Sequence, residues 1–172
     1  MAKLNIIHVP DPMLRTISDP VEEVNDAVRR TLDDMVETMY AAPGIGLAAI
    51  QVGIPRRMLV IDTEGDETSP KPKFLINPEV VWESDDYSVY NEGCLSVPEH
   101  YAEVERPATV RIRYVDYNGK QVEEEMDGLM ATCAQHEIDH LNGVVFIDHL
   151  SKLKRNMIVK KLMKASKDVE IL

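Results

Sequence analysis

The sequence has 172 residues, of which 44% are hydrophobic and 28% charged. This composition is that of a soluble globular protein, and the length fits one domain spanning residues 1–172. A formal net charge of −11 argues against DNA as a partner over the whole surface. No apolar run reaches the length of a signal peptide or the roughly 20 residues that cross a bilayer, so we expect a cytoplasmic protein with no membrane partner.

The first predicted element is an amphipathic helix over Asp26–Tyr40. Its apolar positions recur in steps of three or four residues and therefore share one face, which we expect to be core. These positions are Val24, Val28, Leu32, Met35 and Met39. The helix is expected to end at Ala42–Gly44, where proline and glycine stop the pattern.

The segment that follows, Gly44–Gln51, is rich in small residues. It lacks the third glycine of a dinucleotide-binding loop and the Gly-Lys-Ser/Thr ending of a phosphate-binding loop. Small residues would let a ligand approach the backbone closely. Taken alone, however, the segment is more simply a connection between a helix and a strand.

The middle of the chain predicts strands. Two apolar runs, Arg57–Asp62 and Lys73–Asn77, are separated by a polar loop. Over Val110–Tyr114, apolar residues alternate with arginines, which is typical of a half-buried strand. Asn118–Gly119 then predicts a hairpin turn into a further strand over Gln121–Met126.

Two more helices are predicted after these strands. Asp127 is a plausible N-cap for a helix over Gly128–Leu141, which Asn142–Gly143 would end. A final helix covers about Ser151–Lys167. With helices at both ends and strands between them, the pattern predicts an α+β fold. We expect antiparallel or mixed sheets packed around the central helix, with the last helix at the C-terminus.

The central helix carries a metal-binding pattern. His136 and His140 lie four residues apart, so both imidazoles can reach one ion, and Glu137 can reach a water held by that ion. Two histidines on a helix are more often ordinary surface or core residues. The surrounding segment is apolar, though, and burying these polar groups without coordination would be costly. The pattern therefore favours a metal hydrolase.

A hydrolytic metal needs a third protein ligand and an open position. A metzincin protease would place a histidine where Phe146 stands, and His149 comes three residues too late. Only two cysteines occur, which excludes a disulfide scaffold. Cys94, after a glycine that can bend a strand, is the best third ligand. Cys133 is its rival, but lies seven residues before His140, so we expect it in packing or a pocket wall.

Three motifs occur in one order: Gly44–Gln51, Glu92–Ser96 and Gln135–His140. Together they resemble bacterial peptide deformylase, and the likeness runs from Asp11–Arg15 to the last helix. Members of that family remove the formyl group from the N-terminal formylmethionine of new polypeptides. The resemblance thus implies N-formylmethionyl nascent peptides as substrates and formate as a product.

The resemblance also implies a role for each site residue. Cys94, His136 and His140 would hold one metal ion, and Glu137 would be the general acid and base. The side chain of Gln51 and the backbone N–H of Leu95 would stabilise the oxyanion. The family metal is ferrous iron, Fe²⁺, for which zinc or nickel can substitute. From the residues alone, zinc would be the expectation.

Substrate-binding residues follow from the same likeness. They would form an apolar pocket for methionine and an adjoining backbone wall, and they are Gly44, Ile45, Gly46, Tyr90, Leu129 and Cys133. Relatives often carry arginine where Tyr101 stands, so polar contacts with the substrate beyond methionine are expected to differ here. Arg106 matches the family.

The C-terminal helix is basic. Residues 151–172 contain seven basic and two acidic side chains, a net +5, which leaves −16 on the rest of the chain. The simplest interpretation is a solvated helix face. The alternative is a patch that docks on a polyanion such as RNA. The family resemblance favours the second, with the ribosome as the partner.

Two other functions stay open from the residues. A catalytically idle protein with a structural metal would need a fourth ligand, for which the sequence offers no convincing candidate. A metalloprotease would cut unformylated peptides internally, which a peptide assay would reveal.

Overall fold

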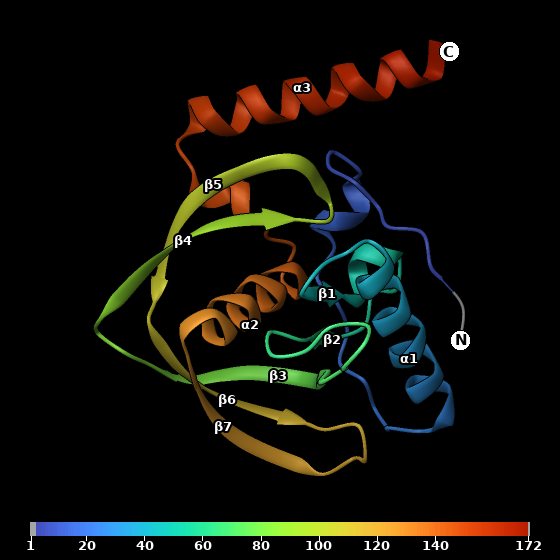
Figure 1. The fold of residues 1–172 in the computed structure, drawn as a ribbon, viewed down its shortest axis with the longest axis vertical. Coiled ribbons are helices and arrows are strands. Elements are labelled where there is room, and N and C mark those ends of the chain that lie inside the picture. The colour runs from blue at the N-terminus through green and yellow to red at the C-terminus, as the bar shows by residue number, and fades with distance from the viewer. Residues whose placement is uncertain (1–2, 172) are drawn as a thin grey trace.

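The computed structural model describes residues 3–171, and their side chains up to residue 165. Two antiparallel sheets enclose one central helix, α2 (Figure 1). The helices are α1 (Asp26–Ala41), α2 (Gly128–Leu141) and α3 (Lys152–Ile171). The strands are β1 (Gly46–Ala48), β2 (Met58–Ile61), β3 (Lys73–Glu83), β4 (Tyr87–Cys94), β5 (Val97–Pro107), β6 (Thr109–Val115) and β7 (Gln121–Asp127). The predicted α+β class is confirmed.

The larger sheet has five strands in the order β1-β2-β3-β6-β7, and all neighbours are antiparallel. Its β6–β7 hairpin turns at Asn118–Gly119, as predicted, with Gly119 at a positive φ of 84°. The buried side of β6 carries Val110, Ile112 and Tyr114. The alternation seen in the sequence therefore buries one face of this hairpin against α2.

Helix α2 is buried on nearly all sides, because every residue from Ala131 to Ile138 is buried. It lies between the five-stranded sheet and the β4–β5 sheet (Figure 1). The predicted bounds of this helix are confirmed. Asp127 does occupy the N-cap position, but its side chain makes no capping hydrogen bond. The backbone enters the helix through Gly128 at a φ of +56°, a conformation that glycine tolerates.

Helix α1 begins one residue after an asparagine cap, whose side chain accepts a hydrogen bond from the Val28 amide at 3.0 Å. Leu32, Met35 and Met39 are fully buried and pack against β1 and β2. The predicted apolar face is thus confirmed as core. The methionines fill this second core cluster rather than contact a cofactor.

Two parts of the sheets differ from the prediction. The hairpin of β4 and β5 was not expected, because its inward face carries polar side chains and gives no apolar alternation. β3 runs on to Glu83 beyond Asn77, where the pairing with β6 shifts register. Asn77 there adopts a φ of +51° and hydrogen-bonds the backbone of Val21 through its side chain. This local bulge lets the strand continue past its asparagine–proline sequence.

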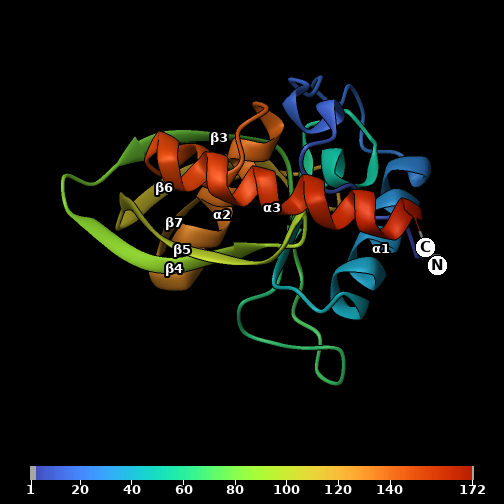
Figure 2. The ribbon, with the colours of Figure 1, turned by 90° about the horizontal axis from the view of Figure 1, so that it is seen from above.

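Helix α3 lies across one side of the body (Figures 1 and 2). It contacts a third core cluster through Ile158, Val159 and Leu162, which recur at helical spacing. Its bounds extend beyond the predicted Ser151–Lys167 at the C-terminal end, and the side chain of Lys167 lies outside the described residues. Among the described residues, no helix has the length and apolarity needed to span a membrane.

Candidate metal centre

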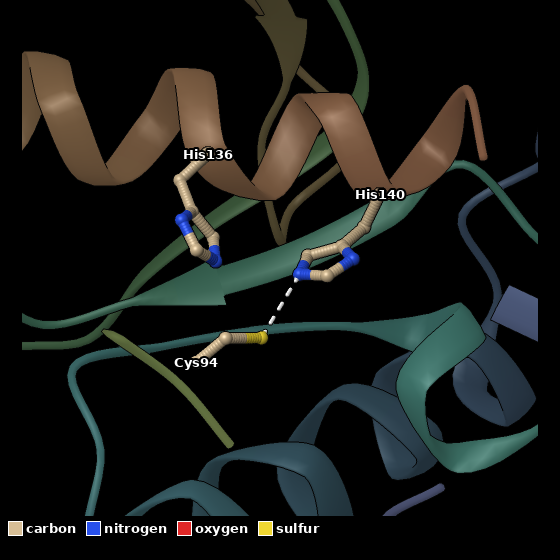
Figure 3. A group of neighbouring side chains, drawn as sticks. All are labelled: Cys94, His136 and His140. Atoms are coloured by element: carbon tan, nitrogen blue, oxygen red, sulfur yellow. Dashed lines mark hydrogen bonds between the residues drawn. The ribbon is translucent and has the colours of Figure 1, made fainter. Parts of the chain in front are cut away.

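Cys94, His136 and His140 converge on one point (Figure 3). Their candidate ligand atoms all lie within 4.8 Å of one another, and the Cys94 Sγ is 3.3 Å from the His140 Nε2. Both histidines project from one face of α2, and the cysteine comes from the end of β4. The Cys133 side chain lies elsewhere, against the carbonyl of Ile45 at 3.6 Å. Of the two cysteines, Cys94 is the one grouped with the histidines.

The position of Cys94 depends on its neighbour Gly93. The aromatic ring of Tyr101, on the paired strand β5, covers this glycine so closely that a Cβ there would lie 2.4 Å from the ring. The register of the hairpin shifts between Gly93 and Cys94. A glycine at this point thus permits both the packing of Tyr101 and the turn that directs the thiol inward.

A buried carboxylate orients His136. The Glu92 Oε1 lies 2.8 Å from the His136 Nδ1, and the Arg106 guanidinium donates two hydrogen bonds to the same carboxylate at 2.7 and 2.9 Å. Burial alone would raise the pKa of Glu92, but the hydrogen bonds from His136 and Arg106 hold it below its ordinary value. An ionised Glu92 accepts a hydrogen bond from the Nδ1–H of His136, which leaves Nε2 free as a ligand atom.

The donor set fits a divalent cation. Two imidazoles and a thiolate make a three-ligand site of the kind that keeps a position open for water or substrate. Burial would lower the pKa of His136, but the neighbouring Cys94 thiol and Glu92 raise it well above its ordinary value. The surroundings of His136 thus favour positive charge at this point, which a metal cation would supply. Burial lowers the pKa of His140 and so keeps it a neutral ligand.

Glu137 lies beside the group. Its Oε1 is 3.7 Å from the His136 Nε2, while its buried Oε2 has no hydrogen-bond partner within the described residues. Burial raises the pKa of this carboxyl to about 7. Gly46 makes room for it, since a Cβ at that glycine would lie 3.1 Å from the Glu137 carboxyl carbon. A carboxyl group that titrates near neutrality is suited to proton transfer.

Gln51 reaches the thiol from the other side. Its Oε1 accepts a hydrogen bond from the Ala48 amide at 2.9 Å, and its Nε2 donates to the Ser96 hydroxyl at 3.0 Å. The same Nε2 lies 3.5 Å from the Cys94 Sγ. Leu95 faces Gly44 across the site, where a Cβ on the glycine would approach the leucine side chain to 2.8 Å. The two predicted motifs therefore do meet at the metal group.

A pocket of roughly 1230 Å³ opens beside these residues. All six residues expected to bind substrate line it: Gly44, Ile45, Gly46, Tyr90, Leu129 and Cys133. Thr132 and the N-terminal segment Lys3–Ile6 also line the pocket and were not predicted. Thr132 could have been found from its place one turn before His136 on α2, whereas the N-terminal segment carries no motif.

Comparison with known proteins agrees with this geometry. The sequence profile of the polypeptide deformylase family matches residues 3–156. The peptide deformylase of Mesorhizobium japonicum is 61% identical over 95% of this chain and 93% of its own length. That of Phenylobacterium zucineum is 57% identical over 97% and 99%. The chain belongs to the peptide deformylase family. It is therefore an enzyme, a metal-dependent hydrolase that removes the formyl group from N-terminal formylmethionine.

Solved structures of deformylases share the fold. The Ehrlichia chaffeensis peptide deformylase, in complex with actinonin, superposes with a TM-score of 0.90 at 44% identity, covering 96% of this chain and 98% of that one. The Legionella pneumophila peptide deformylase gives 0.90 at 43% identity, with 96% of both chains covered. The likeness to deformylases thus extends over nearly the whole fold.

The positions that a metzincin would use are occupied differently in this deformylase. The Phe146 ring is buried and stacks on His136, with ring centres 5.9 Å apart. His149 lies 2.9 Å from the Asp139 carboxylate, and that carboxylate accepts a hydrogen bond from Arg106 at 2.8 Å. The side chain of His149 thus pairs with this carboxylate, whereas Cys94 is grouped with the two histidines.

The pair of Glu92 and Arg106 was missed as part of the site. A signal did exist for Glu92, because it precedes Cys94 by two residues and so shares its face of the strand. Arg106 belongs to the family pattern, but its partner is set by the hairpin register, which the sequence does not display. Both side chains are buried.

Replacing Arg106 by leucine is expected to lower the free energy of unfolding by about 3–5 kcal/mol, because it leaves the Glu92 charge buried without its partner. The folded-state pKa of Glu92 is depressed, so this contribution is present above the carboxyl's ordinary pKa and is lost as the pH falls. Urea unfolding at pH 7 measures the loss. The matched control is Arg113→Leu, which breaks the exposed pair with Glu123 and should cost within about 1 kcal/mol. Equal losses for the two variants would contradict the buried pair's role.

Proposed function

We propose that Cys94, His136 and His140 hold the catalytic metal of this deformylase and that Glu137 transfers the proton. The observation that carries this proposal is the convergence of the three candidate ligands beside a buried, unpaired carboxyl oxygen. All the residues concerned belong to one catalytic domain, which we take to be residues 1–172.

A divalent cation at this site would supply Lewis acidity, activating water and polarising the formyl carbonyl. Glu137 takes a proton from the attacking water and passes it to the leaving amine nitrogen. The amide Nε2 of Gln51 and the backbone N–H of Leu95 donate hydrogen bonds to the oxygen on which negative charge develops. Gln51 is held for this task, because Ala48 and Ser96 fix both ends of its amide.

The methionine side chain would occupy the apolar part of the pocket. Ile45, Leu129 and Cys133 provide apolar surface there, with Tyr90 beside them. The side chain of Ile45 is 44% exposed and that of Leu129 is 42% exposed, so both can lose water contact when a substrate enters. The glycines at 44 and 46 bring backbone to the pocket wall without obstructing it.

We propose ferrous iron as the natural metal, with zinc or nickel able to replace it. The thiolate and imidazole donors are compatible with all three ions, so this choice rests on the family. The substrate is a chain emerging from the ribosome, and we accordingly place the enzyme in the cytoplasm.

Formate release from formyl-Met-Ala-Ser tests the activity. Protein loaded separately with iron, nickel and zinc should release formate and leave the unformylated peptide Met-Ala-Ser uncut. Metal-loaded protein that ignores the formylated peptide would refute the assigned roles. Internal cleavage of a longer unformylated peptide would instead indicate a metalloprotease.

We also propose that α3 docks on ribosomal RNA. Five of its lysines up to residue 164 are exposed and make no ion pair with a described residue: Lys152, Lys154, Lys160, Lys161 and Lys164. Arg155 is half-buried, and its charge helps to lower the pKa of Asp148. Ile158, Val159 and Leu162 pack on the core, and the helical spacing places Lys160, Lys161 and Lys164 on the other side of the helix. The positive charges are thus available to phosphates.

Changing Lys160, Lys161 and Lys164 to glutamine should weaken ribosome binding and reduce the slope of log affinity against log salt by about two. Turnover on short peptides should be unaffected. The control changes Arg30, Arg56 and Lys120 to glutamine, which alters the net charge equally at exposed sites away from α3. Sedimentation with ribosomes across a salt series measures both. An equal effect of the two triple variants would mean that only net charge matters.

A further inference from the structure

A buried carboxylate at the end of β2 ties together three segments near the pocket. Asp62 is 3% exposed, and its side chain accepts hydrogen bonds from the amides of Gly65 at 2.7 Å and Lys71 at 2.9 Å. It also accepts one from the hydroxyl of Tyr40, in the last turn of α1. These bonds fix the loop between β2 and β3, which projects from the body in Figure 2, against the end of α1.

The segment between α1 and β1 is the part of the pocket wall whose position the Asp62 carboxylate can affect. At its start, the Gly44 amide donates to the Met39 carbonyl at 2.8 Å. At its end, the Asp62 amide donates to the Ile45 carbonyl at 2.8 Å. The same carbonyl faces the Cys133 thiol at 3.6 Å. Gly44, Ile45 and Cys133 all line the pocket.

We propose that Tyr40 and Asp62 are positioning residues that hold the Gly44–Ile45 wall in the conformation that binds the formylated peptide. The Tyr40–Asp62 hydrogen bond links the end of α1 to the end of β2. The chain between these two points passes through the Gly44–Ile45 wall and the paired strands β1 and β2. Without this hydrogen bond, Met35 and Met39 still pack α1 on β2, but among these contacts no polar bond fixes the last turn of α1 to the end of β2. The wall would then be displaced in a fraction of the molecules. The apparent affinity for the peptide falls in proportion to the fraction of molecules whose wall is in the binding conformation.

Neither residue lines the pocket, so neither can act by touching the substrate. The metal ligands and Glu137 are held by α2 and β4 and should keep their geometry. The expected signature is therefore a change in peptide binding with little change in the chemical step. This inference rests on the proposed function for its assay.

The test compares Tyr40→Phe with Tyr117→Phe. Each variant removes one hydroxyl that donates to an aspartate, but the Tyr117 bond, at 3.1 Å to Asp33, lies at the middle of α1, about two turns before Tyr40. Tyr40→Phe should raise KM for formyl-Met-Ala-Ser roughly tenfold, the lower end of the effect of one lost hydrogen bond to a charged group, and change kcat less than twofold. The inhibition constant of the product Met-Ala-Ser should rise by the same factor. Tyr117→Phe should match wild type in all three constants.

Asp62→Asn provides a second variant, which weakens the bond from Tyr40 together with those from the Gly65 and Lys71 amides. The double variant with Tyr40→Phe should therefore raise KM no further than Asp62→Asn alone. Tyr40→Phe protein with wild-type KM and a lower melting temperature would overturn the proposal, since the bond would then only stabilise the fold. A fall in kcat at constant KM would overturn it too. Wild-type protein that releases no formate would refute the proposed function itself, a distinct outcome.

Discussion

Replacing Glu137 by alanine is expected to lower kcat for formyl-Met-Ala-Ser by about 10²–10⁴-fold, the range typical of a lost general acid–base group. The carboxyl is buried, and burial raises its pKa to about 7, so it can take up and release a proton near neutral pH. KM should change little, because the alanine leaves the pocket walls in place. Steady-state kinetics on the metal-loaded variant measure the effect.

Metal content distinguishes this role from a structural one. Glu137 does not belong to the group of three candidate ligands, so Glu137→Ala protein should retain one metal ion per chain. The control is Glu105→Ala, which removes an exposed glutamate on the outer face of β5 and should behave as wild type. Loss of metal from the Glu137 variant would show that the carboxylate is a ligand, and full activity would show that it plays no part in proton transfer.

Replacing Cys94 by alanine should weaken metal binding by more than about 100-fold, since even partners of metal ligands contribute 10–100-fold. Turnover should fall with metal occupancy. The informative comparison is Cys133→Ala, because the sequence leaves both cysteines as candidates and the structure groups only Cys94 with the histidines. Titration of the metal-free proteins with Zn²⁺, followed by a competing chelator, measures both affinities.

Retention of metal affinity by Cys94→Ala together with its loss in Cys133→Ala would contradict the assignment. Unchanged metal affinity in both variants would indicate that neither thiol contributes to metal binding. The Cys133 variant should alter the pocket wall, so its peptide kinetics are expected to change even when its metal site is intact.

The part of the site on α2 could be predicted because its information is local. His136 and His140 are one helical turn apart, and the apolar residues around them indicate a buried helix. Cys94 and Gln51 were found through their motifs, which lie in other segments. The structure adds the reason these segments meet: β1 and the turn after it pack against α2, and β4 ends at Cys94 beside the two histidines.

The remainder could not be predicted, because it depends on pairings between distant residues. Arg106 meets Glu92 through the register of β4 and β5, and Tyr40 meets Asp62 across 22 positions of the sequence. The inward side of the β4–β5 hairpin is polar at Glu92 and Arg106, which removes the alternation by which strands are recognised. The buried pair of Glu92 and Arg106 is thus part of the site, and its polar side chains prevent the two strands from being recognised by their sequence pattern.

The division of the candidate ligands between α2 and β4 has a thermodynamic consequence. An ion bound by both elements would act as a cross-link between the central helix and the two-stranded sheet, in addition to the contacts of Glu92 with His136 and of Arg106 with Asp139. Any ligand that binds only the folded state stabilises it by RT ln(1 + L/Kd), where L is the concentration of free ligand. The supply of metal would then determine how long the enzyme stays folded as well as its turnover. The β4–β5 hairpin would be the first region to unfold locally when the ion is removed.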